Sequence, residues 1–170
     1  MLTPANNQVR KELVALYYGQ GSEGQAMHLL HQGMAVSPGY ADFRLMASRI
    51  YLGSGDMQQA YDVLNNLSPS LAHNIDYYAT LAALAQKLKH YSQAQQIYQN
   101  LLQLHSKEGR WWLGLGIALD KEGQGRRALE AYQHASRSAG LTGPSRSYLD
   151  QRIAQLEKNY DSTPAKKATR

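Results

Sequence analysis

Apolar positions recur along most of this chain with the spacing of amphipathic helices, and polar positions lie between them. Segments rich in Ala, Leu, Gln and Tyr have helical lengths, and no stretch shows the sustained two-residue alternation of β-branched residues that strands require. Short breaks containing Gly or Pro separate these segments; they fall at Gly19 and Gly21, Pro38 and Gly39, Gly53 and Gly55, Pro69, Gly109, Gly123 and Gly125, and Gly143 and Pro144. The pattern predicts an all-α chain of about nine helices.

The helical segments repeat with a period of 34 residues. When "EGQAMHLL", "DMQQAYDVL", "YSQAQQIY" and "QGRRALEAY" are aligned, their alanines fall at equal intervals: Ala26, Ala60, Ala94 and Ala128. Four residues after each alanine, one helical turn along, stands a large apolar or aromatic side chain: Leu30, Leu64, Tyr98 and Tyr132. Three equal intervals with matching flanks indicate an array of repeats.

Small residues at fixed positions of the repeat predict how its helices pack. Gly116, and Ala82 and Ser48 at 34-residue intervals before it, let two helix backbones approach closely. Trp112, like Tyr98 and Tyr132, is expected to fill the space beside them. Each helix pair leaves one apolar face uncovered, and the next pair covers it, so a superhelical solenoid is expected.

A 34-residue helix-turn-helix period with these residues resembles the tetratricopeptide repeat (TPR). The segment that begins at Gly109 is most similar to the family pattern, which it matches at Trp112, Leu115, Gly116, Ala128, Tyr132 and Ala135. Arg10 and Arg44 depart from the pattern, because the family has an aromatic residue at that position.

The resemblance implies a right-handed α-solenoid of about four helix pairs. The repeats are expected at about 7–40, 41–74, 75–108 and 109–142. The segment "GPSRSYLDQRIAQLEKN" resembles the helix that closes such arrays, expected at about 144–159, so that the domain covers 1–160. We expect 161–170 to be a disordered tail.

Composition removes several classes of function. The chain has no Cys, which excludes thiol catalysis, disulfides and Cys-ligated metals. Residues 1–86 carry 4 basic and 6 acidic side chains, whereas residues 87–170 carry 14 and 7. A basic half would suit an acidic protein, nucleic acid or anionic lipid, but dispersed surface charge is the preferred interpretation. No apolar run approaches the length of about 20 residues that spans a bilayer, and no signal peptide is evident, so we expect the given chain to be soluble.

No motif points to catalysis or to a bound metal. His28 and His31 lie three residues apart, but no further ligands accompany them, so they are interpreted as surface residues. Gly114 and Gly116 lie within a helix and are interpreted as packing glycines, not as a phosphate loop. Asp120 and Glu122 fall on different helical faces, and an open solenoid desolvates neither carboxylate. We therefore expect no enzymatic activity, cofactor, metal or small-molecule substrate.

The resemblance implies instead a groove lined by the first helices of successive repeats. By register, its lining residues are Gln8, Lys11, Ala15, Tyr18, Leu45, Arg49, Leu52, Ala79, Ala83, Gln86, Arg110, Leu113, Ile117 and Asp120. The centre of this set is apolar and is framed by Lys11, Arg49 and Arg110, which suits an amphipathic helix or an extended peptide of a protein partner.

Two more specialised ligands are disfavoured. The family's carboxylate clamp for acidic C-terminal tails needs Lys and Asn at fixed positions; Lys11 matches one of them, but Ala15 and Met46 replace the asparagines. Nucleic acid would need one basic stripe with exposed aromatics. The aromatic residues of this chain fall at core positions of the repeat, so they are not expected to be exposed beside such a stripe. The arginines that could form the stripe are Arg126, Arg127, Arg137, Arg146 and Arg152.

A closer resemblance covers about residues 40–157. The stretch "EGRWWLGLGIALDKEGQGRRALEAYQHA", together with the segments on either side, is similar to the C-terminal repeat region of biogenesis proteins of the mannose-sensitive haemagglutinin (MSHA) type IV pilus. It implies a scaffold in the periplasm, anchored to the inner membrane by an upstream segment outside this sequence, with pilus or secretion-machinery components as partners. The alternative is a regulatory or chaperone-like adaptor, cytoplasmic, that binds one soluble protein.

The paired tryptophans raise a separate question. Trp112 falls at a core position and is expected to pack within its own repeat. Trp111 lies about 100° further around the helix, so it either packs on the preceding repeat or contacts a partner at the surface. The oligomeric state stays open, because an uncapped N-terminal helix pair could bury its face in a copy of itself.

Overall fold

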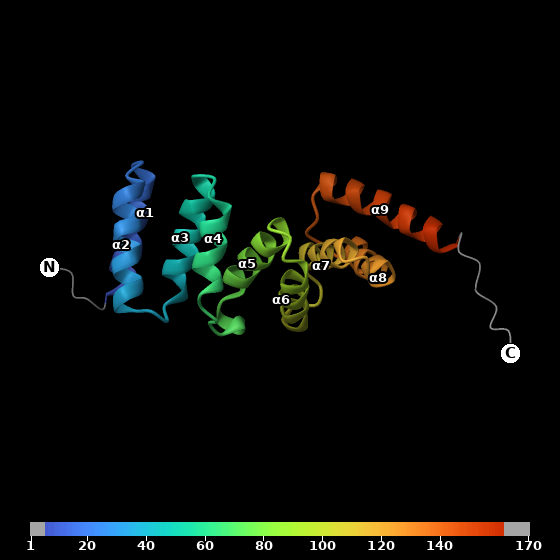
Figure 1. Cartoon of the computed structure of the whole chain (residues 1–170), viewed down its shortest axis with the longest axis horizontal. Coiled ribbons are helices and arrows are strands. Elements are labelled where there is room, and N and C mark those ends of the chain that lie inside the picture. The colour runs from blue at the N-terminus through green and yellow to red at the C-terminus, as the bar shows by residue number, and fades with distance from the viewer. Residues whose placement is uncertain (1–5, 162–170) are drawn as a thin grey trace. The chain divides into compact units, whose positions relative to one another are not determined.

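A computed structural model describes residues 6–161, and in this range the chain is all-α, as predicted. Figure 1 shows its nine helices, which we label in chain order, and a short 3-10 helix. Their bounds are α1 Asn7–Gly19, α2 Glu23–Val36, α3 Ala41–Gly53, α4 Met57–Asn65, η1 Leu71–His73, α5 Ile75–Lys87, α6 Tyr91–Leu104, α7 Gly109–Lys121, α8 Gly125–Ser136 and α9 Gly143–Asp161. The chain forms two compact units, residues 1–84 and 85–170, which we describe separately.

The helix bounds keep the 34-residue period of the sequence. The first helix of each pair begins at Asn7, Ala41, Ile75 or Gly109, and the second at Glu23, Met57, Tyr91 or Gly125. Within each unit, consecutive helices form antiparallel pairs, of which α1 with α2, α3 with α4, and α7 with α8 have the most extensive contacts. The described part is therefore an all-α helical repeat fold.

A left-handed residue closes the turn inside every pair. Gly21, Gly55 and Gly123 adopt φ values of 75°, 84° and 75°, and Lys89 occupies the same position in the third repeat with φ 68°. This conformation lets the chain reverse after the first helix, with a backbone hydrogen bond such as Ser22 N–H to Tyr17 C=O at 2.8 Å. Glycine suits the position because it lacks the Cβ that strains a left-handed residue.

The core of each pair is built on the four alanines of the second helices. Ala26, Ala60, Ala94 and Ala128 are all 0% exposed. In the first unit, Ala26 belongs to a cluster with Val14, Leu30, Phe43 and Ile50. Burial of such side chains contributes about 25 cal/mol per Å² of apolar surface, which makes these contacts the main source of stability in each unit.

The glycines of "GLG" are packing glycines. A Cβ on Gly116 would lie 2.5 Å from Cδ1 of Tyr132, a ring that is completely buried. Gly114 meets the ring of Tyr98 in the same way on the neighbouring helix α6. Both rings therefore occupy the space that a larger side chain on α7 would take.

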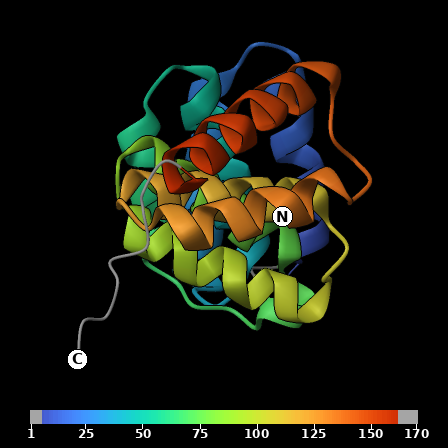
Figure 2. The same cartoon turned by 90° about the vertical axis from the view of Figure 1, so that its right-hand side faces the viewer.

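The last helix, α9, covers α8 in the second unit, as Figure 2 shows. Leu149 and Leu156 are buried at 1% and 4% exposure. Arg152 reaches Asp120 of α7 with two hydrogen bonds, Nε–Oδ2 at 2.6 Å and Nη2–Oδ1 at 2.7 Å, a bidentate ion pair. The predicted disordered tail lies outside the described residues, apart from Asp161. No helix within 6–161 combines the length and the apolar character needed to cross a membrane.

We predict that Gly116→Ala lowers the free energy of unfolding by about 1–3 kcal/mol, because the added methyl collides with the buried Tyr132 ring. Gly24→Ala is the matched control: nothing lies within 4 Å of its Cβ position, so the variant should be neutral or gain up to about 1 kcal/mol of helix propensity. Urea denaturation followed by circular dichroism measures both changes. Equal stability of the two variants would contradict the role of Gly116.

A second prediction concerns alkaline pH. Burial raises the pKa of Tyr98 from 10.0 to about 12. A raised folded-state pKa means that stability is fully present below pH 10 and is lost as the pH rises from 10 through 12, by up to about 3 kcal/mol at the upper end. Unfolding curves at pH 9, 10 and 11 should show a smaller loss in Tyr98→Phe than in the parent. The exposed Tyr18→Phe is the control, and an identical loss in both variants would count against the assignment.

Candidate functional site

The residues predicted to line the groove divide between the two units. Lys11 and Tyr18 lie on α1 and Leu45, Arg49 and Leu52 on α3, all in the first unit; Gln86 lies on α5 and Arg110, Leu113 and Ile117 on α7, in the second unit. All nine side chains are exposed or partly exposed, so each is open to contact from outside its unit.

A cavity between α1 and α3 brings Tyr18 and Arg49 together. It has a volume of about 230 Å³ and is lined by Val14, Ala15, Tyr18, Gly19, Met46, Arg49 and Ile50. Val14 and Ile50 are almost completely buried, whereas Tyr18 is 41% exposed at the edge. Within residues 6–161 no carboxylate lies within ion-pair distance of Arg49. The α1–α3 cavity therefore combines an apolar floor with one exposed cation.

Lys11 does not add a second uncompensated charge. Its Nζ forms an ion pair with Asp42, which also accepts a hydrogen bond of 3.2 Å from the Tyr40 hydroxyl. The hydrogen bond to Asp42 raises the pKa of Lys11, so that the ammonium stays charged but is neutralised locally by its partner. A ligand would have to compete with Asp42 for this cation.

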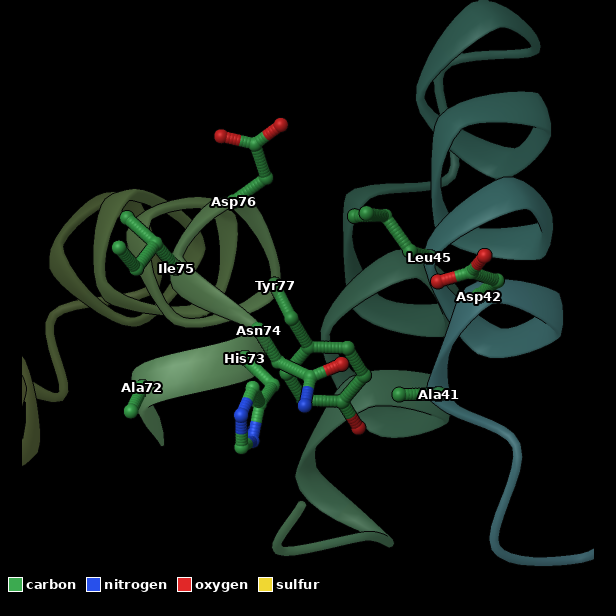
Figure 3. Close-up of a pocket in the computed structure, with 9 residues that line it drawn as sticks. All are labelled: Ala41, Asp42, Leu45, Ala72, His73, Asn74, Ile75, Asp76 and Tyr77. Carbon is green, nitrogen blue, oxygen red and sulfur yellow. The ribbon is translucent and has the colours of Figure 1, made fainter. Parts of the chain in front are cut away.

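A second cavity in the first unit lies between the N-terminal ends of α3 and α5. It has a volume of about 300 Å³ and is lined by Ala41, Asp42, Leu45, Ala72, His73, Asn74, Ile75, Asp76 and Tyr77. Figure 3 shows Asp42 and Leu45 facing it from α3, and Asp76 and Ile75 at the start of α5. The α3–α5 cavity is thus flanked by carboxylates, where the sequence predicted a groove framed by cations.

The two aspartates were missed although a signal for them exists. Asp42 and Asp76 stand at 34-residue intervals between Gln8 and Arg110, which the register assigned to the groove. The same reasoning applied to every repeat would have included them. It would not have revealed the Lys11–Asp42 pair, because that contact depends on side chains of neighbouring helices.

The groove residues of the second unit are also partly compensated. Arg110 Nε forms an ion pair of 3.1 Å with Glu108, whose pKa is lowered by that hydrogen bond. Asp120 is held by Arg152 of α9 and accepts a hydrogen bond of 3.2 Å from the Tyr132 hydroxyl. Asp120 therefore fastens the last helix, and it is not an open groove residue.

Trp111 is buried and not exposed to a partner. Only 8% of the residue is accessible, and its ring meets the edge of His105, at the end of α6, with centroids 5.9 Å apart. This corrects the expectation of a surface contact and supports the other interpretation, packing on the preceding repeat. The signal was present in the sequence, because Phe43 and Tyr77 stand at the same position of earlier repeats and are 0% and 1% exposed.

Trp112 packs within its own repeat but is only half-buried. Its ring stacks on His134 of α8 at 4.3 Å between centroids and 15° between planes. Its Nε1 donates a hydrogen bond of 2.7 Å to the carbonyl oxygen of Ser106. Arg10 occupies the same position of the first repeat, where its buried side chain lies against Gly33 and replaces the aromatic ring.

The polar residues considered for catalysis are dispersed. Glu122 accepts hydrogen bonds from Ser92 and, at 2.8 Å, from Gln124, away from the Asp120–Arg152 pair. His28 is hydrogen-bonded to Gln32 on the exposed side of α2. In the part of the chain that the structure describes, no three His, Asp or Glu side chains converge as metal ligands.

Comparison with known proteins agrees with this architecture. Residues 17–84 match the family model of the tetratricopeptide repeat. Curated proteins give no match. Among solved structures, a crystal structure of MamA is 16% identical, with a TM-score of 0.70, over 87% of this chain and 84% of that one. MamA from Desulfovibrio magneticus RS-1, residues 41 to the end, is 15% identical, with a TM-score of 0.65, over 93% and 97% of the two chains.

A third structure is that of YrrB, described as a TPR protein with an unusual peptide-binding site. It is 14% identical, with a TM-score of 0.72, over 91% of this chain and 78% of that one. At these identities the likeness shows the fold alone. The family match covers residues 17–84, and the structural likeness shows an all-α helical repeat fold for the chain.

We predict that Trp111→Ala costs about 3–5 kcal/mol of unfolding free energy, since it removes a large buried ring. Trp112→Ala should cost less, because its ring is partly exposed and loses less surface from water on folding. Chemical denaturation of the two variants, each with one tryptophan left as a fluorescent probe, measures the difference. A larger loss for Trp112→Ala would show that the stacked pair with His134 is the stronger contact.

Proposed function

We propose that this protein is a non-catalytic scaffold for protein–protein interaction that binds an extended segment of its partner at the first helices of its repeats. The observation that carries the proposal is the α1–α3 cavity, where an apolar floor adjoins the exposed guanidinium of Arg49. Such a site can hold an apolar side chain of a peptide while Arg49 pairs with a carboxylate one or two residues away.

The repeat fold suits this role better than it suits catalysis. Within each unit the first helices carry exposed side chains, such as Arg49 in the first unit and Arg110 in the second, where water has access and ionisable groups are little desolvated. Two of the predicted cations, Lys11 and Arg110, are paired with Asp42 and Glu108. Recognition in the first unit then depends mainly on Arg49 and the apolar residues beside it.

For the biological setting, we infer assembly of an MSHA-type type IV pilus. The inference rests on the resemblance of the tryptophan-containing repeat and the last helix to the pilus biogenesis protein MshN. It implies that the intact protein is held at the inner membrane, with these repeats in the periplasm and pilus or secretion-machinery components as partners.

The second candidate is an adaptor that captures one soluble protein. Its support is the discrete cavity of about 230 Å³, which is large enough for one anchoring side chain, and the structural likeness to a protein described as having an unusual peptide-binding site. The cellular fraction that contains the partner separates the two candidates: the scaffold requires membrane-associated partners, and the adaptor a soluble one.

The test is affinity capture after crosslinking in intact piliated cells. The parent chain should recover pilus or secretion components, and Arg49→Glu should reduce that recovery about fivefold or more, since it places a carboxylate where the partner's carboxylate would pair. Arg49→Glu combined with Arg110→Glu tests whether the second unit contributes.

Asp62→Lys, on α4, is the matched surface-charge control and should leave recovery unchanged. Undiminished capture by the double variant would remove the groove from the function. Capture of a soluble protein alone would favour the adaptor. Circular dichroism of each variant is the check that it is folded.

A further inference from the structure

The outer side of the first helix pair differs from the same side of later pairs. Val9, Glu12 and Leu16 of α1 lie three and four residues apart and so share one side of the helix. Phe43 and Trp111, which stand at the position of Val9 in later repeats, are buried at 0% and 8% exposure. The comparison shows what this side of a first helix normally contacts.

In later repeats, the preceding pair covers this side. Its second helix packs along this side, and in the first unit Met46 and Ile50, the counterparts of Glu12 and Leu16, also face α1 across the α1–α3 cavity. In the second unit, α6 packs along α7, with Tyr98 over Gly114 and His105 against Trp111. In the first unit, α2 packs along α3, where a Cβ on Gly33 would lie 2.7 Å from the Phe43 ring. In both units, therefore, an aromatic or apolar side chain of one helix contacts a small residue of the other.

On α1 the corresponding side is open within the described residues. Leu16 is 53% exposed, the most of any large apolar side chain there. Its counterparts Ile50, Leu84 and Ala118 are 5%, 3% and 0% exposed. Leu16 thus carries apolar surface that the repeat pattern elsewhere removes from water, and this surface favours a contact.

A cavity between α1 and α2 begins at Tyr17, the residue that follows Leu16. It has a volume of about 270 Å³ and is lined by Tyr17, Gly24, Gln25, His28 and Leu29. In the fourth repeat, the counterparts Leu119, Arg127, Glu130 and Ala131 line a cavity of about 200 Å³, and there Gln99 of α6 supplies a further wall. The α1–α2 cavity is likewise walled by the first and the second helix of its pair, but within the described residues no preceding helix supplies a third wall.

Glu12 specifies the chemistry of the occupant. It stands at the position of Gly114, over which the Tyr98 ring lies in the fourth repeat. Its exposed carboxylate accepts a hydrogen bond of 3.0 Å from Gln8, and it forms no ion pair within residues 6–161. An aromatic ring placed over Glu12 would desolvate the charge, whereas Lys or Arg would pair with it and lay its aliphatic stem along Leu16.

We propose that the side of α1 formed by Val9, Glu12 and Leu16, with the adjoining α1–α2 cavity, docks an amphipathic helix of a partner protein. This helix has the pattern of the chain's own second helices, a small residue followed one turn later by a larger one, with Arg or Lys as the larger residue. The site is separate from the α1–α3 cavity and does not depend on the function proposed for it.

The test uses two synthetic helices and the full chain. One is the chain's own segment 89–105, "KHYSQAQQIYQNLLQLH", and the other carries Tyr98→Arg in that segment. Isothermal titration calorimetry should show about two- to fivefold tighter binding of the arginine peptide, the range expected for one exposed ion pair. Glu12→Lys should reverse the preference, and Leu16→Glu should abolish binding of both peptides.

Asp62→Lys is the matched control, because Asp62 also accepts a hydrogen bond from a glutamine four residues earlier, Gln58 at 2.9 Å. It should leave both affinities unchanged. Equal affinity for the two peptides, or binding that survives Leu16→Glu, would overturn the proposal. So would light scattering that shows a dimer of the parent chain which Leu16→Glu dissociates, because a second copy would then cover this side.

Discussion

The close approach of small residues to large rings is the contact on which the other features of each unit depend. Gly116 leaves room for Tyr132, Gly114 for Tyr98 and Gly33 for Phe43. Because these positions are completely packed, helix spacing within a unit is set by the size of the facing side chain. The surface residues one position away are thereby held at defined places, which is what a recognition surface requires.

Ion pairs then decide which surface charges are open to a ligand. Lys11 is compensated by Asp42, and Asp120 is used by Arg152 to fasten α9. The Lys11–Asp42 pair is partly exposed, and pairs near the surface add little to stability, about 0–1 kcal/mol. The bidentate Asp120–Arg152 pair is more buried. Arg49 on the α1–α3 cavity and Glu12 on the outer side of α1, in contrast, have no ion-pair partner in the described part of the chain and are open to a ligand.

Helix α1 takes part in two different surfaces. Ala15 and Tyr18 line the α1–α3 cavity beside the cation Arg49. Val9, Glu12 and Leu16 form the outer side, where Glu12 is the anion. One helix can serve both because side chains project in all directions around it. The two surfaces suit partner segments of opposite charge, so a scaffold built on α1 can hold two ligands without competition between like charges.

The sequence by itself determined the helices and their repeat, since helical periodicity, the glycine breaks and the four equally spaced alanines are local patterns that every pair shares. The sequence also contained a signal for the burial of Trp111. Comparison with Phe43 and Tyr77, at the same position of earlier repeats, would have revealed it, whereas the fourth repeat considered alone did not. Only the tertiary structure decided the Lys11–Asp42 and Asp120–Arg152 pairs and the carboxylates beside the α3–α5 cavity. The physical reason is that repeat packing constrains the buried positions, whereas contacts between partly exposed charges 31 or 32 residues apart depend on side-chain reach across neighbouring helices.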